Sequence, residues 1–306
     1  MTMVAEPPPP APPIPLPPPA PLPPRGNPGL RLAGQMVVIV GGLMLCFVVQ
    51  FAALGTLKHG RDQNRAHEEL RVLLANATAP VSAVDEGGRL LDSGTPLGIL
   101  EIPRLGVREV IGEGTSARAL KSGPGHLRDT PMPGQAGGSV ILGRRAGYGG
   151  PFAQLDKLTP GDVVKVTTGQ GEHTFRVQGT RRAGDPQRHV PQAGKGGLTL
   201  ATADGSYFLP TDVLWVDAKL TSDVQPNSGA LPKFAVPDNE QVMAGDQEAL
   251  VPVALWALVL AAGAIAVVFL HVRVGRWQAW VVGVPLLGAL GITLADQAAA
   301  LLPNLI

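Results

Sequence analysis

The sequence predicts a mainly β domain, folded as a closed or nearly closed barrel and flanked by transmembrane helices. Two observations support this prediction. Residues 96–220 contain short β-branched stretches separated by glycine and proline turns, the pattern of many short strands in a barrel. The 306 residues are 45% hydrophobic and only 16% charged, which is too apolar for an ordinary soluble protein and indicates membrane spans.

The N-terminal part is expected to be a tail followed by a membrane anchor. Residues 1–33 are rich in proline, a composition that favours extended polyproline II and cannot bury a core, so we predict a disordered cytoplasmic tail. A docking site for a proline-binding partner is the alternative. Residues 34–57 are long and apolar enough to cross a hydrocarbon layer of about 30 Å as a helix. No signal-peptide cleavage site is evident after them, which predicts an uncleaved anchor.

A stalk that continues the first helix, followed by a linker, is expected to connect this anchor to the barrel. Within residues 58–95, helix-forming residues with leucines on one face come first, and glycine, serine and aspartate follow. After the barrel, residues 221–249 are interpreted as a second linker. Residues 250–270 and 277–302 then form two more spans, separated by a short basic loop at 271–276 that allows only a helical hairpin.

The six strand-like stretches of the barrel are expected where β-branched residues alternate between turn signals. They are residues 98–102, 139–143, 163–168, 173–178, 198–202 and 213–218. The length of the domain is enough for one hydrophobic core.

Basic residues give opposing signals about the orientation of the chain in a plasma membrane. Arg25 and Arg31 before the first span, and two arginines in the hairpin loop, favour the cytoplasm, which places the barrel outside. Lys58, Arg61 and Arg65 just beyond the first span favour the reverse. Long domains translocate largely regardless of charge, so basic residues alone leave the orientation open.

The composition excludes several classes of protein. The net charge of +1 argues against a nucleic-acid binder. Cys46 is the only cysteine and lies in an apolar run, so neither an internal disulfide nor a cysteine metal site is possible. His173 and His189 have no second ligand at metal spacing and are interpreted as surface histidines. No metal and no cofactor are therefore expected.

Residues 198–204 (LTLATAD) are the reference point for the remaining motifs. They alternate apolar or branched residues with small ones and break at Asp204 and Gly205, a turn signal, as a half-buried strand would. The domain also carries, in chain order, IPRLGV (102–107), GPGH (123–126), GSVILG (138–143), PFAQLDKL (151–158) and PGD (160–162). Together these motifs resemble the sortases, the membrane-anchored cysteine transpeptidases of Gram-positive cell envelopes. With its helices on both flanks, the chain is most similar to actinobacterial, class E-like members.

The resemblance implies a sortase-type β-barrel on the outer face of the membrane and a site of three residues. In the family, a cysteine thiolate attacks a peptide carbonyl, a histidine protonates the leaving amine, and an arginine supports the oxyanion or positions the substrate. The cysteine position is Ala203 here, the histidine position is Arg144 and the arginine position is Val213. A shift of one residue would put Asp212 at the third position, which is not a cation either. The resemblance therefore implies a catalytically degenerate member, a pseudosortase with no catalytic residues.

Other residues near the three positions have plain structural interpretations. His126 belongs to the GPGH motif, to which the resemblance gives a structural role. Ser206 would be a nucleophile, with Asp204 as its catalytic partner, only if a base lay within hydrogen-bond reach of the serine, and the sequence places none there. A turn is the favoured explanation of both residues.

A run of arginines is expected at the mouth of the groove. Arg145 follows Arg144, and Arg181 and Arg182 come after the next two strand-like stretches of the chain. These side chains either form a basic patch that binds an acidic or carboxylate partner or belong to a solvated charged face.

Three functions remain open at the level of sequence. The first is a non-catalytic binding or scaffold role in surface-protein handling, with the membrane and a sorting-signal peptide, a surface protein or an active sortase as candidate partners. The alternative is a cysteine-independent transpeptidase or hydrolase with relocated catalytic residues. The third is a decaying paralogue with only structural contributions. An open groove would favour binding, and a filled groove would favour a scaffold.

Overall fold

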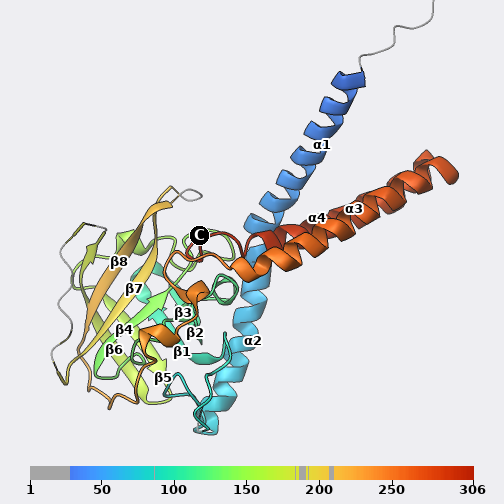
Figure 1. Ribbon diagram of the computed structural model, residues 1–306. Helices are drawn as coiled ribbons and strands as arrows, with labels where there is room; N and C mark the ends of the chain where they lie inside the picture. Colours follow the sequence, from blue (N-terminus) through green and yellow to red (C-terminus); the bar gives the residue numbers. More distant parts are fainter. Residues whose placement is uncertain (1–27, 86, 183, 186–190, 192, 207–209) are drawn as a thin grey trace, which may run out of the picture. The chain divides into compact units, whose positions relative to one another are not determined.

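The computed structural model describes residues 28–85, 87–182, 184–185, 191, 193–206 and 210–306. The chain divides into two compact units, residues 1–41 and residues 42–306, and Figure 1 labels its helices and strands. Within the first unit, the described part is the beginning of helix α1. Residues 1–27 of the expected disordered tail lie outside the described residues, and so does His189.

One helical rod contains both the anchor and the stalk of the sequence prediction. Helix α1 (Pro28–Val49) continues through a π-helical turn, η1 (Gln50–Leu54), into α2 (Gly55–Ala75). The helix begins at Pro28 rather than at residue 34, so residues 28–33 are not part of a disordered tail. Pro28 opens the helix, where the fixed φ of proline suits a helical start and its missing N–H costs nothing.

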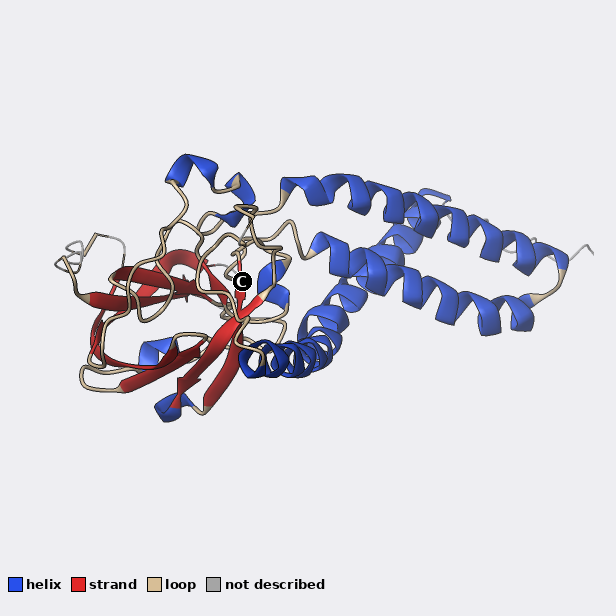
Figure 2. Cartoon of the chain, turned by 90° about the horizontal axis from the view of Figure 1, so that it is seen from below, coloured by secondary structure: helices blue, strands red, loops and turns tan. Residues whose placement is uncertain are grey.

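The C-terminal part contains the expected helical hairpin. Helices α3 (Leu250–Arg273) and α4 (Arg276–Ala298) are joined by a short turn and lie side by side (Figure 2). Among the described residues, three helical segments are long and apolar enough to cross a membrane: Val37–Ala75, Gln247–Arg273 and Arg276–Ala298. The prediction of helices capable of spanning a membrane is confirmed.

The middle of the chain is a closed β-barrel, as predicted. Around the barrel the described strands follow the order β1-β2-β3-β4-β7-β8-β6-β5. Their bounds are Pro96–Ile102 (β1), Val107–Glu113 (β2), Gly125–His126 (β3), Gly137–Leu142 (β4), Val163–Thr168 (β5), Gly171–Arg181 (β6), Gly196–Gly205 (β7) and Pro210–Leu220 (β8). The pairs β2–β3 and β4–β7 are parallel, and the other pairs are antiparallel.

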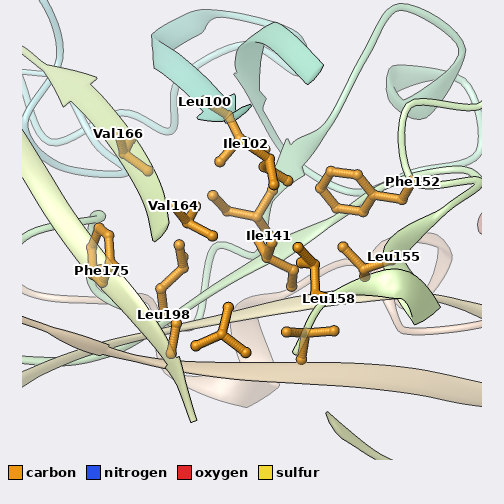
Figure 3. Packing of buried hydrophobic residues seen from close by; sticks show 14 of the residues in the cluster. Leu100, Ile102, Ile141, Phe152, Leu155, Leu158, Val164, Val166, Phe175 and Leu198 are labelled. Carbon is orange, nitrogen blue, oxygen red and sulfur yellow. The ribbon is translucent and has the colours of Figure 1, made fainter. Parts of the chain in front are cut away.

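The barrel interior is filled by branched and aromatic side chains from every side (Figure 3). Phe152 lies on a loop after β4 and still reaches this core, where it is fully buried. The other labelled members are Leu100, Ile102, Ile141, Leu155, Leu158, Val164, Val166, Phe175 and Leu198. Each such side chain contributes roughly 1.5–3 kcal/mol when it is fully buried, so this cluster fixes the register of the strands.

Two segments differ from the sequence prediction because they pack against the barrel. Residues 221–249, expected to be a linker, contain the short helices η5 (Lys233–Ala235), η6 (Asp238–Glu240) and η7 (Gln247–Ala249). Glu240 is buried there and forms an ion pair with Arg128, 2.9 Å between Oε2 and Nε. Helix α4 ends at Ala298, so residues 299–302 are not part of the third span. They begin a segment, 299–306, that packs on the barrel.

Candidate functional site

Strands β4, β7 and β8 bring the three predicted site positions together. Ala203 on β7 is the register partner of Val213 on β8. Strand β4 runs parallel to β7 as far as the pair Leu142 and Ala201. Beyond it, the Gly143 N–H donates to the Ala201 carbonyl at 3.0 Å. Arg144 follows directly, so all three positions lie at neighbouring strand ends.

The two faces of β7 are buried against different partners. Leu198 and Leu200 point into the barrel core. Ala201 and Ala203 belong instead to a second apolar cluster, together with Leu305. Its other members are Leu120 and Leu142, with Leu127, Val140, Val213, Trp215, Val242 and Met243 packed against them. Ala203 is only 2% exposed, so the position expected at a groove is covered.

Arg144 is fully buried and points toward residues 299–306. Its Nη1 donates to the main-chain oxygen of Ile306, and its Nη2 donates to the carbonyl of Ala117 at 2.7 Å. The guanidinium lies 5.1 Å from the ring centroid of Tyr148. Burial lowers the pKa of Arg144 to about 10, and the fields of Tyr148 and Asp296 oppose that shift. Arg144 is therefore a protonated donor at neutral pH and cannot accept a proton as a general base.

Asp296, near the end of α4, is the centre of a polar cluster beside this site. Its carboxylate accepts hydrogen bonds from Tyr148 Oη at 2.8 Å and from Gln50 Nε2 at 3.0 Å. Lys121 Nζ lies 3.3 Å from the same carboxylate, and Lys58 Nζ lies 3.6 Å from it. Burial raises the pKa of the Tyr148 hydroxyl and lowers the pKa of Lys121 to about 8, although the Asp296 charge opposes the second shift.

The arginines expected at the groove mouth are paired with carboxylates. Arg145 Nη1 lies 3.0 Å from Asp204 Oδ1 and also donates to the Ala203 carbonyl, while Arg182 Nε donates to Asp204 Oδ2. Burial raises the pKa of Asp204, but the hydrogen bonds from Arg182, Gly205 and Arg145 outweigh it and leave the pKa below its ordinary value.

Arg181 is held in a similar way. Its Nε lies 2.8 Å from Asp217 Oδ2, and its guanidinium lies 4.9 Å from the ring centroid of Trp215. Arg145, Arg181 and Arg182 are thus each held in an ion pair, and Arg144 is buried.

The predicted alternative catalytic residues occupy structural or isolated places. His126 is fully buried, with Nδ1 3.1 Å from Glu113 Oε2 and Nε2 3.0 Å from the Pro131 carbonyl. Ser206 is exposed, and within the described part of the chain no hydrogen bond joins it to a histidine or a carboxylate. His126 therefore braces β3, and Ser206 has no base beside it among those residues.

The interpretation of His173 as a surface histidine is wrong. His173 is 2% exposed and lies against Gly134, where a side chain would overlap its ring. Burial lowers the pKa of its imidazole. Within the described residues no group of His, Cys, Asp and Glu side chains could hold a metal ion.

Sequence reasoning missed the C-terminal segment and the Asp296 cluster. A signal for the second was present, because Asp296 is the only charged residue in the stretch 277–302, and an ionisable residue in an apolar helix usually has a specific partner. Nothing comparable distinguishes Leu305, since its apolar neighbours continue the composition of the preceding span.

Comparison with known proteins gives one consistent family. The model of the sortase domain matches residues 100–220. Sortase D of Bacillus subtilis (strain 168) is 33% identical over 90 residues, which cover 29% of this chain and 44% of that protein. Sortase SrtE1 of Streptomyces coelicolor is 29% identical over 145 residues, 45% of this chain and 39% of the relative. The chain thus spans less than half the length of either relative.

Solved structures with a similar fold include a sortase D5 transpeptidase of Clostridium perfringens. Its identity is 22% and its TM-score 0.44, covering 53% of this chain and 99% of that one. Sortase E1 of Streptomyces coelicolor was solved with a tripeptide in its active site. Its sequence identity is 24% and its TM-score 0.37, and the match covers 42% of this chain and 88% of that one.

Proposed function

Because the chain belongs to the sortase family through residues 100–220, we propose that it is a membrane-anchored, non-catalytic member of that family. Its role is binding or scaffolding in the handling of surface proteins at a Gram-positive, actinobacterial cell envelope. The candidate partners besides the membrane are a sorting-signal peptide, a surface protein and an active sortase. The barrel lies outside the plasma membrane and the N-terminal tail lies in the cytoplasm.

The observation that supports this proposal is the chemistry of the three strand-end positions. Ala203 has no lone pair to attack a carbonyl, Val213 cannot support an oxyanion, and Arg144 keeps its proton. Cys46, the only thiol in the chain, belongs to an apolar helix and packs beside Gly291 of α4. A thiolate mechanism therefore has no nucleophile in the barrel.

The packing around these positions also argues against a relocated active site. Asp204 is committed to Arg145 and Arg182, and both ring nitrogens of His126 face acceptors inside the barrel wall. A serine nucleophile requires a base within hydrogen-bond reach, and Ser206 lacks one among the described residues. A scaffold is also favoured over a decaying paralogue, since Arg144 is fully buried with two hydrogen bonds from its guanidinium and Ala203 is buried in an apolar cluster.

The test measures whether the purified chain in detergent cleaves or transfers a peptide substrate. We expect neither cleavage nor transfer of a peptide that carries a sorting signal, and no effect of iodoacetamide. Changing Ala203→Cys alone should give at most faint activity, because the groups of such a site act as a unit. The triple variant Ala203→Cys, Arg144→His, Val213→Arg restores all three side chains, and activity there would show that a peptide still reaches the site and that only the chemistry was lost. Robust turnover by the unmodified chain, free of any partner sortase, would refute the proposal.

A further inference from the structure

We infer that residues 299–306, here called the C-terminal segment, are a built-in ligand of the cleft over Ala203, so that any other peptide must displace them to bind there. This inference rests on the proposed function, since it assigns the occupant of the same site. The word cleft is used here for the surface that this segment covers. That surface is formed by the outward face of β4, β7 and β8 together with Arg144, Thr115, Ala117, Gln241 and Ala244.

The segment fills the cleft with side chains rather than lying across it. Leu305 is fully buried in the cluster that contains Ala203, and Ile306, 4% exposed, belongs to a neighbouring cluster with Tyr148 and Phe51. The carboxamide of Asn304 is also fully buried, and its Nδ2 donates to the carbonyls of Thr115 at 2.7 Å and Gln241 at 2.8 Å.

The main chain of the segment is recognised as well. Arg145 N–H donates to the Leu305 carbonyl at 2.9 Å, and Arg144 donates to the main-chain oxygen of Ile306. Asn304 N–H donates to the Ala244 carbonyl at 2.9 Å. Residues 303–306 form a tight turn, closed by the Ile306 N–H donating to the Pro303 carbonyl at 3.1 Å, so the segment is bound as a turn rather than as an extended strand. The cleft therefore holds an amide side chain followed by two apolar side chains, those of residues 304–306.

The segment is tethered at its start, which sets how strongly it competes. Helix α4 ends at Ala298, and Asp296 is held by Tyr148 and Lys121 beside the cleft. A ligand on so short a tether has an effective concentration on the order of millimolar or above. A free peptide of ordinary affinity therefore does not enter, whereas a release of the Asp296 cluster would open the cleft.

The experiment measures access to position 203 by thiol labelling, which needs no catalysis. Full-length protein in detergent carries Cys46→Ser and Ala203→Cys and is treated with a bulky maleimide. We expect labelling at least tenfold slower than at Ser228→Cys, an exposed reference position. Adding Leu305→Asp should raise the rate at position 203 at least tenfold, because a carboxylate cannot stay in the apolar cluster.

Two controls keep the result specific. Leu301→Asp makes the same chemical change in the same segment, at a residue outside the cluster, and should leave the rate unchanged. Val164→Cys reports on the barrel core and should stay slow in every variant. If Leu305→Asp exposes Val164→Cys too, the milder Leu305→Ala takes its place with the same expected direction.

A peptide with the sequence of residues 299–306 completes the test. At millimolar concentration it should restore protection to Ala203→Cys in the Leu305→Asp chain, while the same peptide with aspartate for leucine should not. Fast labelling of Ala203→Cys with the segment intact would overturn the inference and leave the lack of turnover untouched. Protection that survives both Leu305→Asp and Leu305→Ala would overturn it as well, since something else would then cover the position.

Discussion

At the scale of single residues, Lys121 gives the chain a specific dependence on pH. Its pKa is about 8 in the folded protein, below the ordinary 10.5, chiefly because the side chain is buried. Between these values the unfolded chain binds more protons than the folded one, so the free energy of unfolding rises with pH by about 3 kcal/mol in total. Lys121→Met should remove this rise, as measured by guanidinium titration in detergent between about pH 7 and 11. Lys165→Met, at an exposed ion pair with Glu172, is the control and should keep it. Parallel pH profiles for the parent and Lys121→Met would contradict this assignment.

At the scale of elements, the loop after β4 is fitted to the helical rod. Gly147 has φ +63°, and a Cβ there would overlap the ring of Phe51. Gly161 has φ +99° with open space around it. Both Gly→Ala changes place a side chain in left-handed backbone, at about 1–2 kcal/mol, but only Gly147→Ala also overpacks, which adds about 1–3 kcal/mol. We expect the larger loss of thermal stability in Gly147→Ala, with partial recovery in the double variant Phe51→Ala, Gly147→Ala. Equal losses of thermal stability for Gly147→Ala and Gly161→Ala would contradict this prediction, because the loop would then accommodate the added methyl group at no cost in free energy.

At the scale of the whole molecule, the hairpin loop predicts the topology of the chain. The connection 271–276 contains Arg273 and Arg276, and basic short loops remain in the cytoplasm. In intact cells, an impermeant maleimide should label Ser228→Cys from outside and should label Val274→Cys only after lysis. The parent with its native Cys46 sets the background. Labelling of Val274→Cys in intact cells, with protection of Ser228→Cys, would mean the opposite orientation.

At the same scale, some strands and site positions could be predicted from the sequence and others could not. Strands β1 and β4 to β8 were predictable because alternation and turn residues act locally, whereas β3 has two residues and no period to detect. The positions 144, 203 and 213 could be placed at strand ends through their neighbours. The cover over these positions could not be predicted, because Leu305 and Ile306 continue the apolar composition of the span before them. Hydrophobicity does not distinguish burial in lipid from burial against a barrel.

The attachment of the barrel at several points has a consequence for how it meets other molecules. Gly55 lies so close to the Tyr148 ring that a Cβ would touch it at 3.0 Å, and Asp296 pins the return of α4 beside the same loop. A domain on one flexible stalk samples many directions and reaches far from its anchor. A domain clamped to two separate helices has little rotational freedom and little reach. Under the proposed function, a membrane-anchored partner would reach such a domain by lateral diffusion along the bilayer, a search in two dimensions in which the face presented is already set.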